Sequence, residues 1–190
     1  MLVVTGANGF IGSVLVWELN QAGYTDILCV DHVSPDQRPD NLKHLEYIEC
    51  ISPEEFLQRG PDLDMHGLFH MGACSSTTET NEAYLRKNNT DYTKSMWNLC
   101  IEKSCPLIYA SSAAIYGDGS HGFDDTVATS TYTPLNLYGW SKHWFDDWAE
   151  QQTNQPKRWY GLRFFNVYGP NEYHKNDMAS VAFKAFLQIQ

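Results

Sequence analysis

The chain has 190 residues, which is enough for one domain with a full hydrophobic core. Its formal net charge of -10 argues against a partner with a phosphate backbone, such as DNA or RNA. The 5 cysteines form no C-x-x-C pair and no cluster with zinc spacing, so we expect free thiols, a reducing compartment such as the cytoplasm, and no metal. No apolar run reaches the length that a membrane span needs, so no membrane partner is expected.

Short β-branched runs alternate with longer amphipathic stretches. This alternation predicts an α/β fold, a doubly wound parallel sheet with helices on both faces. The predicted strands are Leu2–Thr5, Ile27–Asp31, Leu45–Glu49, Gly67–His70, Leu107–Ala110 and Trp159–Arg163. The predicted helices are Phe10–Ala22, Pro53–Arg59, Asn81–Lys103, Leu137–Gln152 and a last one from Met178 onward. Because that last helical pattern ends without a capping Gly or Pro, we expect the protein to continue beyond it.

Two stretches depart from this simple pattern. Gly117–Pro134 is irregular and rich in Gly, Ser, Thr and Asp, and a loop of this length in a compact domain is usually functional or mobile. In the helix predicted from Asn81, Asn88 shares the inward face with Leu85 and Tyr92, which indicates that this face touches something polar.

A glycine-rich turn lies between the first predicted strand and the first predicted helix. Its glycines have the spacing G-x-x-G-x-x-G. Gly6 allows a sharp turn off the strand, Gly9 allows backbone approach to a pyrophosphate, and Gly12 allows close packing of helix and strand. The pyrophosphate then meets the free N–H groups at the positive end of the helix. The turn therefore predicts a dinucleotide site.

Asp31 ends the second predicted strand, where a carboxylate that binds the ribose of a dinucleotide is expected. Asp31 alone favours NAD, because a carboxylate repels the 2′-phosphate of NADP. His32 and Arg38 follow closely and supply positive charge, so the sequence leaves the choice between NAD and NADP open.

Tyr138 and Lys142 are four residues apart in a predicted helix and so lie on one helix face. Such a pair arises easily by chance, so its position carries the inference: the helix follows the fifth predicted strand, and Ser111-Ser112 comes directly after that strand. Ligands of open α/β sheets bind beyond the carboxyl ends of the strands. A nearby ammonium and an oxidised nicotinamide both favour the phenolate of Tyr138, which can then remove a hydroxyl proton while hydride leaves the adjacent carbon. Ser112 is expected to hold the same substrate oxygen.

These residues resemble the extended short-chain dehydrogenase/reductase family, whose nucleotide-binding domain has the Rossmann fold. Asn166–Pro170 resembles its sugar-nucleotide branch, and Gly72–Glu79 and His174–Phe183 are similar to the ADP-heptose 6-epimerases of that branch. The resemblance begins at Leu2 and stops short of the family's C-terminal substrate-binding part. It implies an NADP-binding Rossmann domain at 1–165 and the truncated start of the substrate-binding region at 166–190.

The resemblance implies an isomerase that makes no net redox change and serves lipopolysaccharide core biosynthesis. Hydride would leave C6 of an ADP-heptose, giving a transient 6-keto sugar, and would return to the other face. Tyr138 and Lys175 match the two opposed acid/base groups, Ser112 the hydroxyl that steadies the carbonyl oxygen, and Lys142 the group that holds the nicotinamide ribose. A homo-oligomer, suspected to be a pentamer, is also implied.

The implied cofactor is a tightly held NADP, with NAD as the alternative. The residues that match its contacts are Gly6, Gly9, Phe10, Ile11, Gly12, Asp31, His32, Arg38, Met71, Gly72, Ala73, Cys74, Ser75, Asn88, Lys142, Val167 and Lys175. The residues that match substrate contacts are Ser112, Asn166, Asp177 and Lys184.

Five positions depart from the family's common residues. Met71, His32 and Arg38 stand where Glu, Asn and Lys are common, which bears on the NADP preference. Asp177 and Lys184 stand where Ser and His are common, which bears on the sugar contacts.

The alternatives are a 4-epimerase, dehydratase or reductase of the same family, or a dinucleotide-binding protein without catalysis. Ala113-Ala114 stands where a dehydratase would place Asp-Glu, and a 4-epimerase would not need Lys175. We expect His70 to be a core or supporting residue and Cys74 to pack near the cofactor, neither being a metal ligand.

Overall fold

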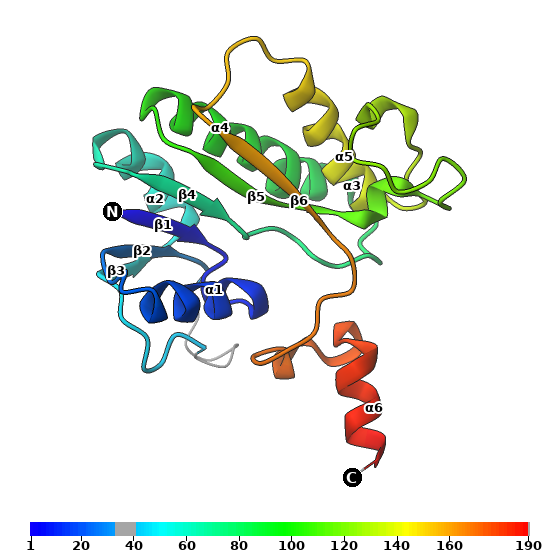
Figure 1. Ribbon diagram of the computed structural model, residues 1–190, viewed down its shortest axis with the longest axis horizontal. Helices are drawn as coiled ribbons and strands as arrows, with labels where there is room; N and C mark the ends of the chain where they lie inside the picture. Colours follow the sequence, from blue (N-terminus) through cyan, green and yellow to red (C-terminus); the bar gives the residue numbers. More distant parts are fainter. Residues whose placement is uncertain (33–40, 190) are drawn as a thin grey trace.

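A six-stranded, all-parallel sheet forms the centre of the protein (Figure 1). The computed structural model describes residues 1–32 and 41–189, with only the backbone of Asn176 and Asp177. The strand order is β3-β2-β1-β4-β5-β6, which is the order of the Rossmann fold and confirms the predicted fold class. The strands are β1 (Leu2–Thr5), β2 (Ile27–Val30), β3 (Glu49–Ile51), β4 (Gly67–His70), β5 (Leu107–Ser112) and β6 (Trp159–Phe164).

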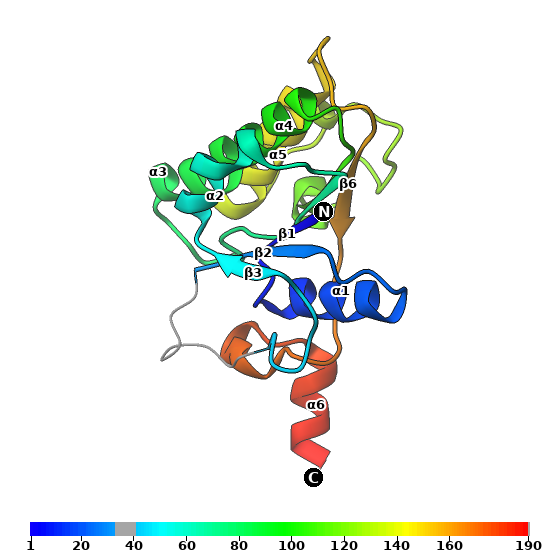
Figure 2. The ribbon, with the colours of Figure 1, turned by 90° about the vertical axis from the view of Figure 1, so that its left-hand side faces the viewer.

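Helices cover both faces of the sheet (Figure 2). One face carries α2 (Pro53–Arg59), α3 (Glu82–Leu85), α4 (Tyr92–Glu102) and α5 (Leu137–Glu150), and the other carries α1 (Phe10–Gln21). Adjacent residues of β1 serve the two faces, because side chains alternate along a strand. Val3 packs with Trp97 and Phe145 in the larger core, and Val4 packs in a smaller core beneath α1.

The third strand lies farther along the chain than predicted. Its predicted range was Leu45–Glu49, but it spans Glu49–Ile51. Leu45 and Tyr47 gave the alternating pattern because they pack against the core beneath α1. The side chain of Asn20 takes both backbone polar groups of Glu46 at 2.8 Å, so Glu46 cannot pair with β2.

The helix predicted at Asn81–Lys103 is not uniform. A π-helical segment, Arg86–Asp91, separates α3 from α4. The wider turn directs Asn89 and Thr90 toward α5, where both bond Ser141: the Asn89 amide donates to its hydroxyl at 2.9 Å and the Thr90 hydroxyl to its carbonyl at 2.8 Å. These polar contacts compensate for the poorer hydrogen bonding of the π segment.

The irregular stretch Gly117–Pro134 folds around its own small core. Tyr132 packs there against Ile115 and Tyr116, and its hydroxyl donates to the carbonyl of Asp124 at 2.6 Å. After β6 the chain crosses to the side of α1, makes a 3-10 turn at Tyr173–Met178 and ends in α6 (Val181–Ile189). Figure 1 shows α6 projecting away from the sheet. No helix within residues 1–32 and 41–189 is long and apolar enough to cross a membrane.

Candidate active site

A crevice of about 1160 Å³ opens beyond the carboxyl ends of β1, β4 and β5. The order of the sheet reverses between β1 and β4, and open α/β sheets bind their ligands at such a switch point. The predicted site residues in its wall are Gly6, Gly9, Phe10, Ile11, Gly12, Asp31, His32, Met71, Gly72, Ala73, Cys74, Ser75, Asn88, Ser112, Tyr138, Lys142, Asn166, Val167 and Lys175.

Three predicted site residues are not placed in this wall. Lys184 lies on α6 with an exposed side chain, outside the crevice wall that the described residues form. Arg38 and the side chain of Asp177 lie outside the described residues.

Two glycines of the turn, Gly6 and Gly12, leave no room for a side chain. Gly6 has a φ of +66°, and a Cβ there would lie 2.6 Å from the Cα of Gly72. A Cβ on Gly12 would lie 2.0 Å from the carbonyl oxygen of Gly6, which places the start of α1 directly against β1. Gly9 precedes α1 and offers no side chain to cap its first N–H groups. These bare N–H groups face a crevice of sufficient size, so the residues fit a dinucleotide pyrophosphate.

Asp31 is buried beside this turn. Its carboxylate accepts the backbone N–H of Asn8 at 2.9 Å. Asn8 in turn bonds Asn41 through its side-chain oxygen and its carbonyl, at 3.0 and 3.1 Å. Asp31 is thus fixed at the end of β2, in the position expected of a ribose-binding carboxylate.

Asn89 supports the side of the crevice that the loop after β4 forms. It was not among the predicted site residues. Its amide group accepts the N–H of Cys74 at 2.8 Å and donates to the carbonyl of Cys74 at 3.0 Å. The same amide nitrogen donates to Ser141 Oγ, and Ser141 lies between Tyr138 and Lys142 in the chain. One fully buried side chain therefore joins the loop after β4 to the helix that bears Tyr138 and Lys142.

His70 is buried beneath the crevice, as the sequence predicted. Thr93 donates its hydroxyl proton to the carbonyl of Asn89 at 2.6 Å, so it accepts from His70 Nε2–H at 2.9 Å. Nδ1 then accepts from Thr5 Oγ1 at 2.6 Å, and Thr5 Oγ1 accepts the N–H of Gly72. Burial and the nearby Lys142 lower the pKa of His70 to about 3, which keeps the imidazole neutral. His70 is therefore a structural link between Thr5 of β1 and Thr93 of α4.

Ser112, Tyr138 and Lys142 meet at the end of β5. Ser112 ends the strand, and its Oγ accepts the N–H of Ala114 at 3.1 Å. Its hydroxyl lies beside Tyr138. Asn136 caps α5 by accepting the N–H of Gly139 at 2.7 Å, which fixes the start of the helix beside Ser112.

Tyr138 and Lys142 both have shifted pKa values. Burial raises the pKa of Tyr138, and the hydrogen bond with Ser112 opposes this. Burial lowers the pKa of Lys142 to about 8, while its Nζ donates to the carbonyl of Ala110 at 2.8 Å. A base with a raised pKa needs added positive charge to act near neutrality, and an ammonium and an oxidised nicotinamide are both suitable sources.

Lys175 reaches the crevice from the segment after β6. Its Nζ lies 5.7 Å from the ring centre of Phe10, next to the glycine turn. Glu172 organises this segment: its carboxylate accepts the N–H groups of Gly169 and Ser180 at 3.0 and 2.7 Å. Asn171 ties the segment to α1 by donating to Ser13 Oγ at 2.9 Å. The structure thus brings Lys175 and Tyr138 into one crevice, from elements far apart in the sequence.

Within the part of the chain that the structure describes, no group of His, Cys, Asp and Glu side chains is placed to hold a metal ion. The site consists of a dinucleotide cradle, a serine-bonded phenol and two lysines. This arrangement is suited to moving a proton from a hydroxyl group beside a nicotinamide ring.

Known proteins are similar to this chain in sequence and in fold. Over its full length the chain is 49% identical to an ADP-L-glycero-D-manno-heptose-6-epimerase of Fusobacterium nucleatum, of which it covers 59%. The solved structure of the Helicobacter pylori enzyme of the same name has a TM-score of 0.82 and 27% identity, over 96% of this chain and 60% of that one. MoeE5 bound to UDP-glucuronic acid and NAD has a TM-score of 0.69 and 26% identity, over 90% and 56%.

The chain thus spans about three fifths of the length of the relatives that it matches. A family model matches residues 2–190. Because that match covers almost the whole chain, the chain belongs to the NAD dependent epimerase/dehydratase family.

Proposed function

We propose that the full-length protein is an NADP-dependent ADP-heptose 6-epimerase that interconverts ADP-D-glycero- and ADP-L-glycero-D-manno-heptose. The observation that carries the proposal is the meeting of Ser112, Tyr138, Lys142 and Lys175 in one crevice beside the glycine turn. The proposal of this sugar and reaction is supported by the names of relatives at up to 49% identity. Lipopolysaccharide core biosynthesis is the process that such an enzyme would serve.

In the proposed reaction Tyr138 accepts the proton of the C6 hydroxyl as C6 becomes a ketone. Ser112 donates a hydrogen bond to the same oxygen, and Lys142 holds a positive charge beneath the phenolate. The bound dinucleotide would supply a hydride acceptor and return the hydride, so that no net oxidation occurs. Lys175 is the acid/base group for the second face of the 6-keto sugar, with Asn166 contacting the substrate. Asp177 and Lys184 remain proposed substrate contacts.

We propose that residues 1–165 hold the cofactor and that residues 166–190 begin the part that binds the sugar nucleotide. Two observations support this division. The cradle and Tyr138 lie before β6 ends, and the segment with Asn166 and Lys175 crosses to the other side of the sheet. For the full-length protein we propose a homo-oligomer, which sedimentation analysis would test.

Two arguments on the choice of cofactor point in opposite directions. Family resemblance supports NADP, whereas the buried carboxylate of Asp31 favours NAD. Titration of the full-length protein with each dinucleotide would decide this. Tighter binding of NAD by tenfold or more would refute NADP as the resident cofactor while leaving the epimerase proposal intact.

The decisive experiment is a substrate panel with the full-length protein. We expect the two ADP-heptose epimers to interconvert, while UDP-glucose and UDP-galactose remain unchanged. Interconversion of the UDP-hexoses alone would make the protein a 4-epimerase. Loss of water from any sugar would make it a dehydratase, against the expectation from Ala113 and Ala114.

A further inference from the structure

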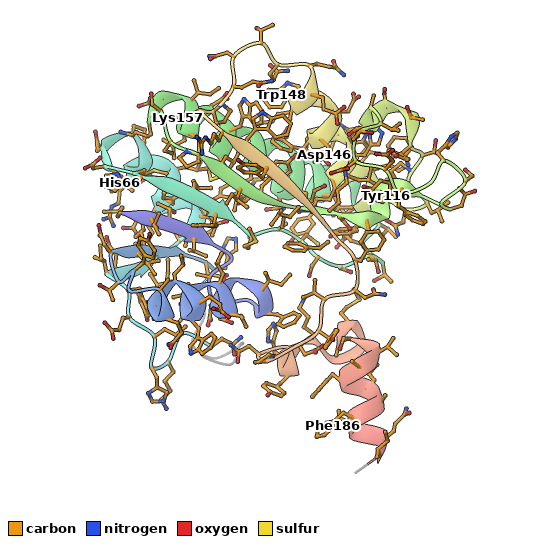
Figure 3. The ribbon with its side chains drawn as sticks, viewed as in Figure 1. His66, Tyr116, Asp146, Trp148, Lys157 and Phe186 are labelled. Atoms are coloured by element: carbon orange, nitrogen blue, oxygen red, sulfur yellow. The ribbon has the colours of Figure 1, made fainter. Side chains whose placement is uncertain are left out.

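One carboxylate lies beneath the site, on the same helix as its tyrosine and lysine. Asp146 is one helical turn beyond Lys142 and two turns beyond Tyr138, so the three side chains share one face of α5. Asp146 lies where α5 packs against the sheet (Figure 3) and is 4% exposed. It does not line the crevice as the described residues form it, so it does not touch a ligand there.

We propose that Asp146 is a positioning residue, which locks α5 onto the end of β5 and supplies the negative charge that keeps the buried Lys142 an ammonium. This inference deepens the proposed function and rests on it for the role of Lys142.

The first support is a set of contacts between α5 and β5. Lys142 donates to the carbonyl of Ala110 at 2.8 Å, Ser111 Oγ donates to Asp146 at 2.7 Å, and Ser112 lies beside Tyr138. Three successive strand residues therefore meet three residues on one helix face. Because Ser111 precedes Ser112, the Asp146 contact fixes the strand end that presents the serine to Tyr138.

The second support is the way Asp146 itself is held. One oxygen accepts the hydroxyl of Tyr109 at 2.9 Å. The other, which Ser111 bonds, also accepts Arg163 Nε–H at 3.3 Å from β6. Burial raises the pKa of Asp146, but the bonds from Ser111, Arg163 and Tyr109 oppose this by favouring the carboxylate. Arg163 also lies 3.7 Å from Glu150, one turn farther along α5, so its charge is shared between two carboxylates.

The third support is the charge around Lys142. An ammonium that is 6% exposed is costly to hold without a negative partner. His70 of β4 is neutral, Tyr138 is a phenol whose pKa burial raises, and Cys74 lies on the loop after β4. Asp146 is a further neighbour, and its charge raises the pKa of Lys142. An arginine and two hydroxyl groups donate to its carboxylate and favour the charged form, so it is the anion that balances the ammonium.

The test measures the charge of Lys142 directly, in the full-length protein. Lys142 would be trace-labelled with acetic anhydride, which reacts with the neutral amine, over a range of pH, and its labelling quantified by mass spectrometry. Asp146→Asn keeps the size of the side chain and removes its charge. We expect this variant to label at least about tenfold faster at pH 6, because losing an opposite charge lowers a lysine pKa by about one unit or more. The alkaline limb of the epimerase pH profile should move to lower pH with it.

The matched control is Asp147→Asn, one residue along the helix. The carboxylate of Asp147 accepts a hydrogen bond from Gln151 of the same helix end at 2.9 Å, so both readouts should match those of the wild type. Asp146→Glu, which restores the charge, should bring the labelling rate back toward the wild type.

A folded Asp146→Asn variant whose Lys142 labels at the wild-type rate would overturn the proposal. If that variant does not fold, the wild type decides: a Lys142 labelling midpoint at pH 6 or below would show that no carboxylate is holding the ammonium. Labelling needs no turnover, so its outcome is separate from that of the proposed function. A wild type that labels as expected but epimerises no ADP-heptose contradicts the function alone.

Discussion

The hydroxyl of Ser112 lies beside the phenol of Tyr138 and favours its phenolate, while the oxygen of the same hydroxyl accepts the N–H of Ala114. This contact uses a lone pair of Ser112 Oγ and leaves its hydroxyl proton available to the oxygen of Tyr138. A donor aimed at this oxygen favours the phenolate and lowers the pKa of Tyr138 against the effect of burial.

Ser112→Ala should reduce kcat of the full-length enzyme by about 100-fold, the usual cost of removing one such donor. Because the pKa of Tyr138 then rises, the acid limb of the pH profile should move to higher pH. Ser120→Ala, in the exposed loop after β5, is the control and should leave both unchanged. A lower rate with an unmoved acid limb would show that Ser112 acts on the substrate and not on Tyr138.

Tyr138→Phe should abolish interconversion of the heptose epimers while the cofactor stays bound, because the ring and its packing remain and only the proton acceptor is lost. Product analysis by chromatography and cofactor absorbance on the same sample check the two halves of this prediction. A variant that epimerises at the wild-type rate would remove Tyr138 from the mechanism.

Lys175→Met keeps the length of the side chain and removes the amine. If Lys175 serves the second face of the sugar, turnover should fall by about 100-fold or more, the typical contribution of a general acid/base. Lys157→Met, on the loop before β6, changes charge to the same extent at an exposed position and should have no effect. Near-normal activity of Lys175→Met would support a mechanism with Tyr138 as the single base.

Much of the cradle could be predicted because it depends on local geometry. Glycines at fixed spacing after a strand form one turn. A tyrosine and a lysine four residues apart share one helix face. Neither arrangement depends on the rest of the fold. Strands that end at one edge of a parallel sheet then bring Gly6 and Ser112 to the same crevice.

The supporting polar residues could not be predicted in this way. The partner of Asn89 is Ser141, 52 residues away, and nothing near either residue announces the contact. Helical periodicity placed Asn88 inward, but the π-helical segment adds one residue to a turn and rotates the inward position to Asn89. Asn88 still lines the crevice. The sequence therefore predicted the polar face of this helix but not that Asn89 is its buried residue.

Asp146 had an equally weak signal. An acid near the end of an amphipathic helix usually faces solvent, and its burial becomes visible only once Arg163 of β6 lies beside it. The predicted range of the third strand was wrong for the same kind of reason. Asn20, which is 26 residues from Glu46 in the sequence, determines where β3 begins.

Gly12→Ala should cost about 3 kcal/mol or more of unfolding free energy and prevent dinucleotide binding, because the new Cβ would lie 2.0 Å from the carbonyl oxygen of Gly6. Gly67→Ala is the matched control. Its Cβ would meet the side chains of Leu2 and Pro106 at 3.5 and 3.6 Å, which is ordinary contact, and stability should change by less than about 1 kcal/mol. Urea unfolding and cofactor titration of both variants test the comparison. A stable, cofactor-binding Gly12→Ala protein would show that helix and strand are not packed as closely as described.

The buried His70 should make stability depend on pH. Burial lowers its pKa to about 3, so between the pKa of an unfolded histidine, about 6.5, and 3 the unfolded chain binds a proton that the folded chain does not. Its contribution is fully present above pH 6.5 and is lost as the pH falls, by up to about 1.4 kcal/mol per pH unit within that window. Urea unfolding of His70→Asn across pH 4 to 7 should therefore show a shallower slope than the wild type, although the variant is less stable at pH 7 because Thr5 and Thr93 lose their partner. His66→Asn, on an exposed histidine, should keep the wild-type slope. Parallel slopes for His70→Asn and the wild type would mean that the imidazole takes up its proton in the folded state. A neutral His70 between Thr5 and Thr93 would then be ruled out.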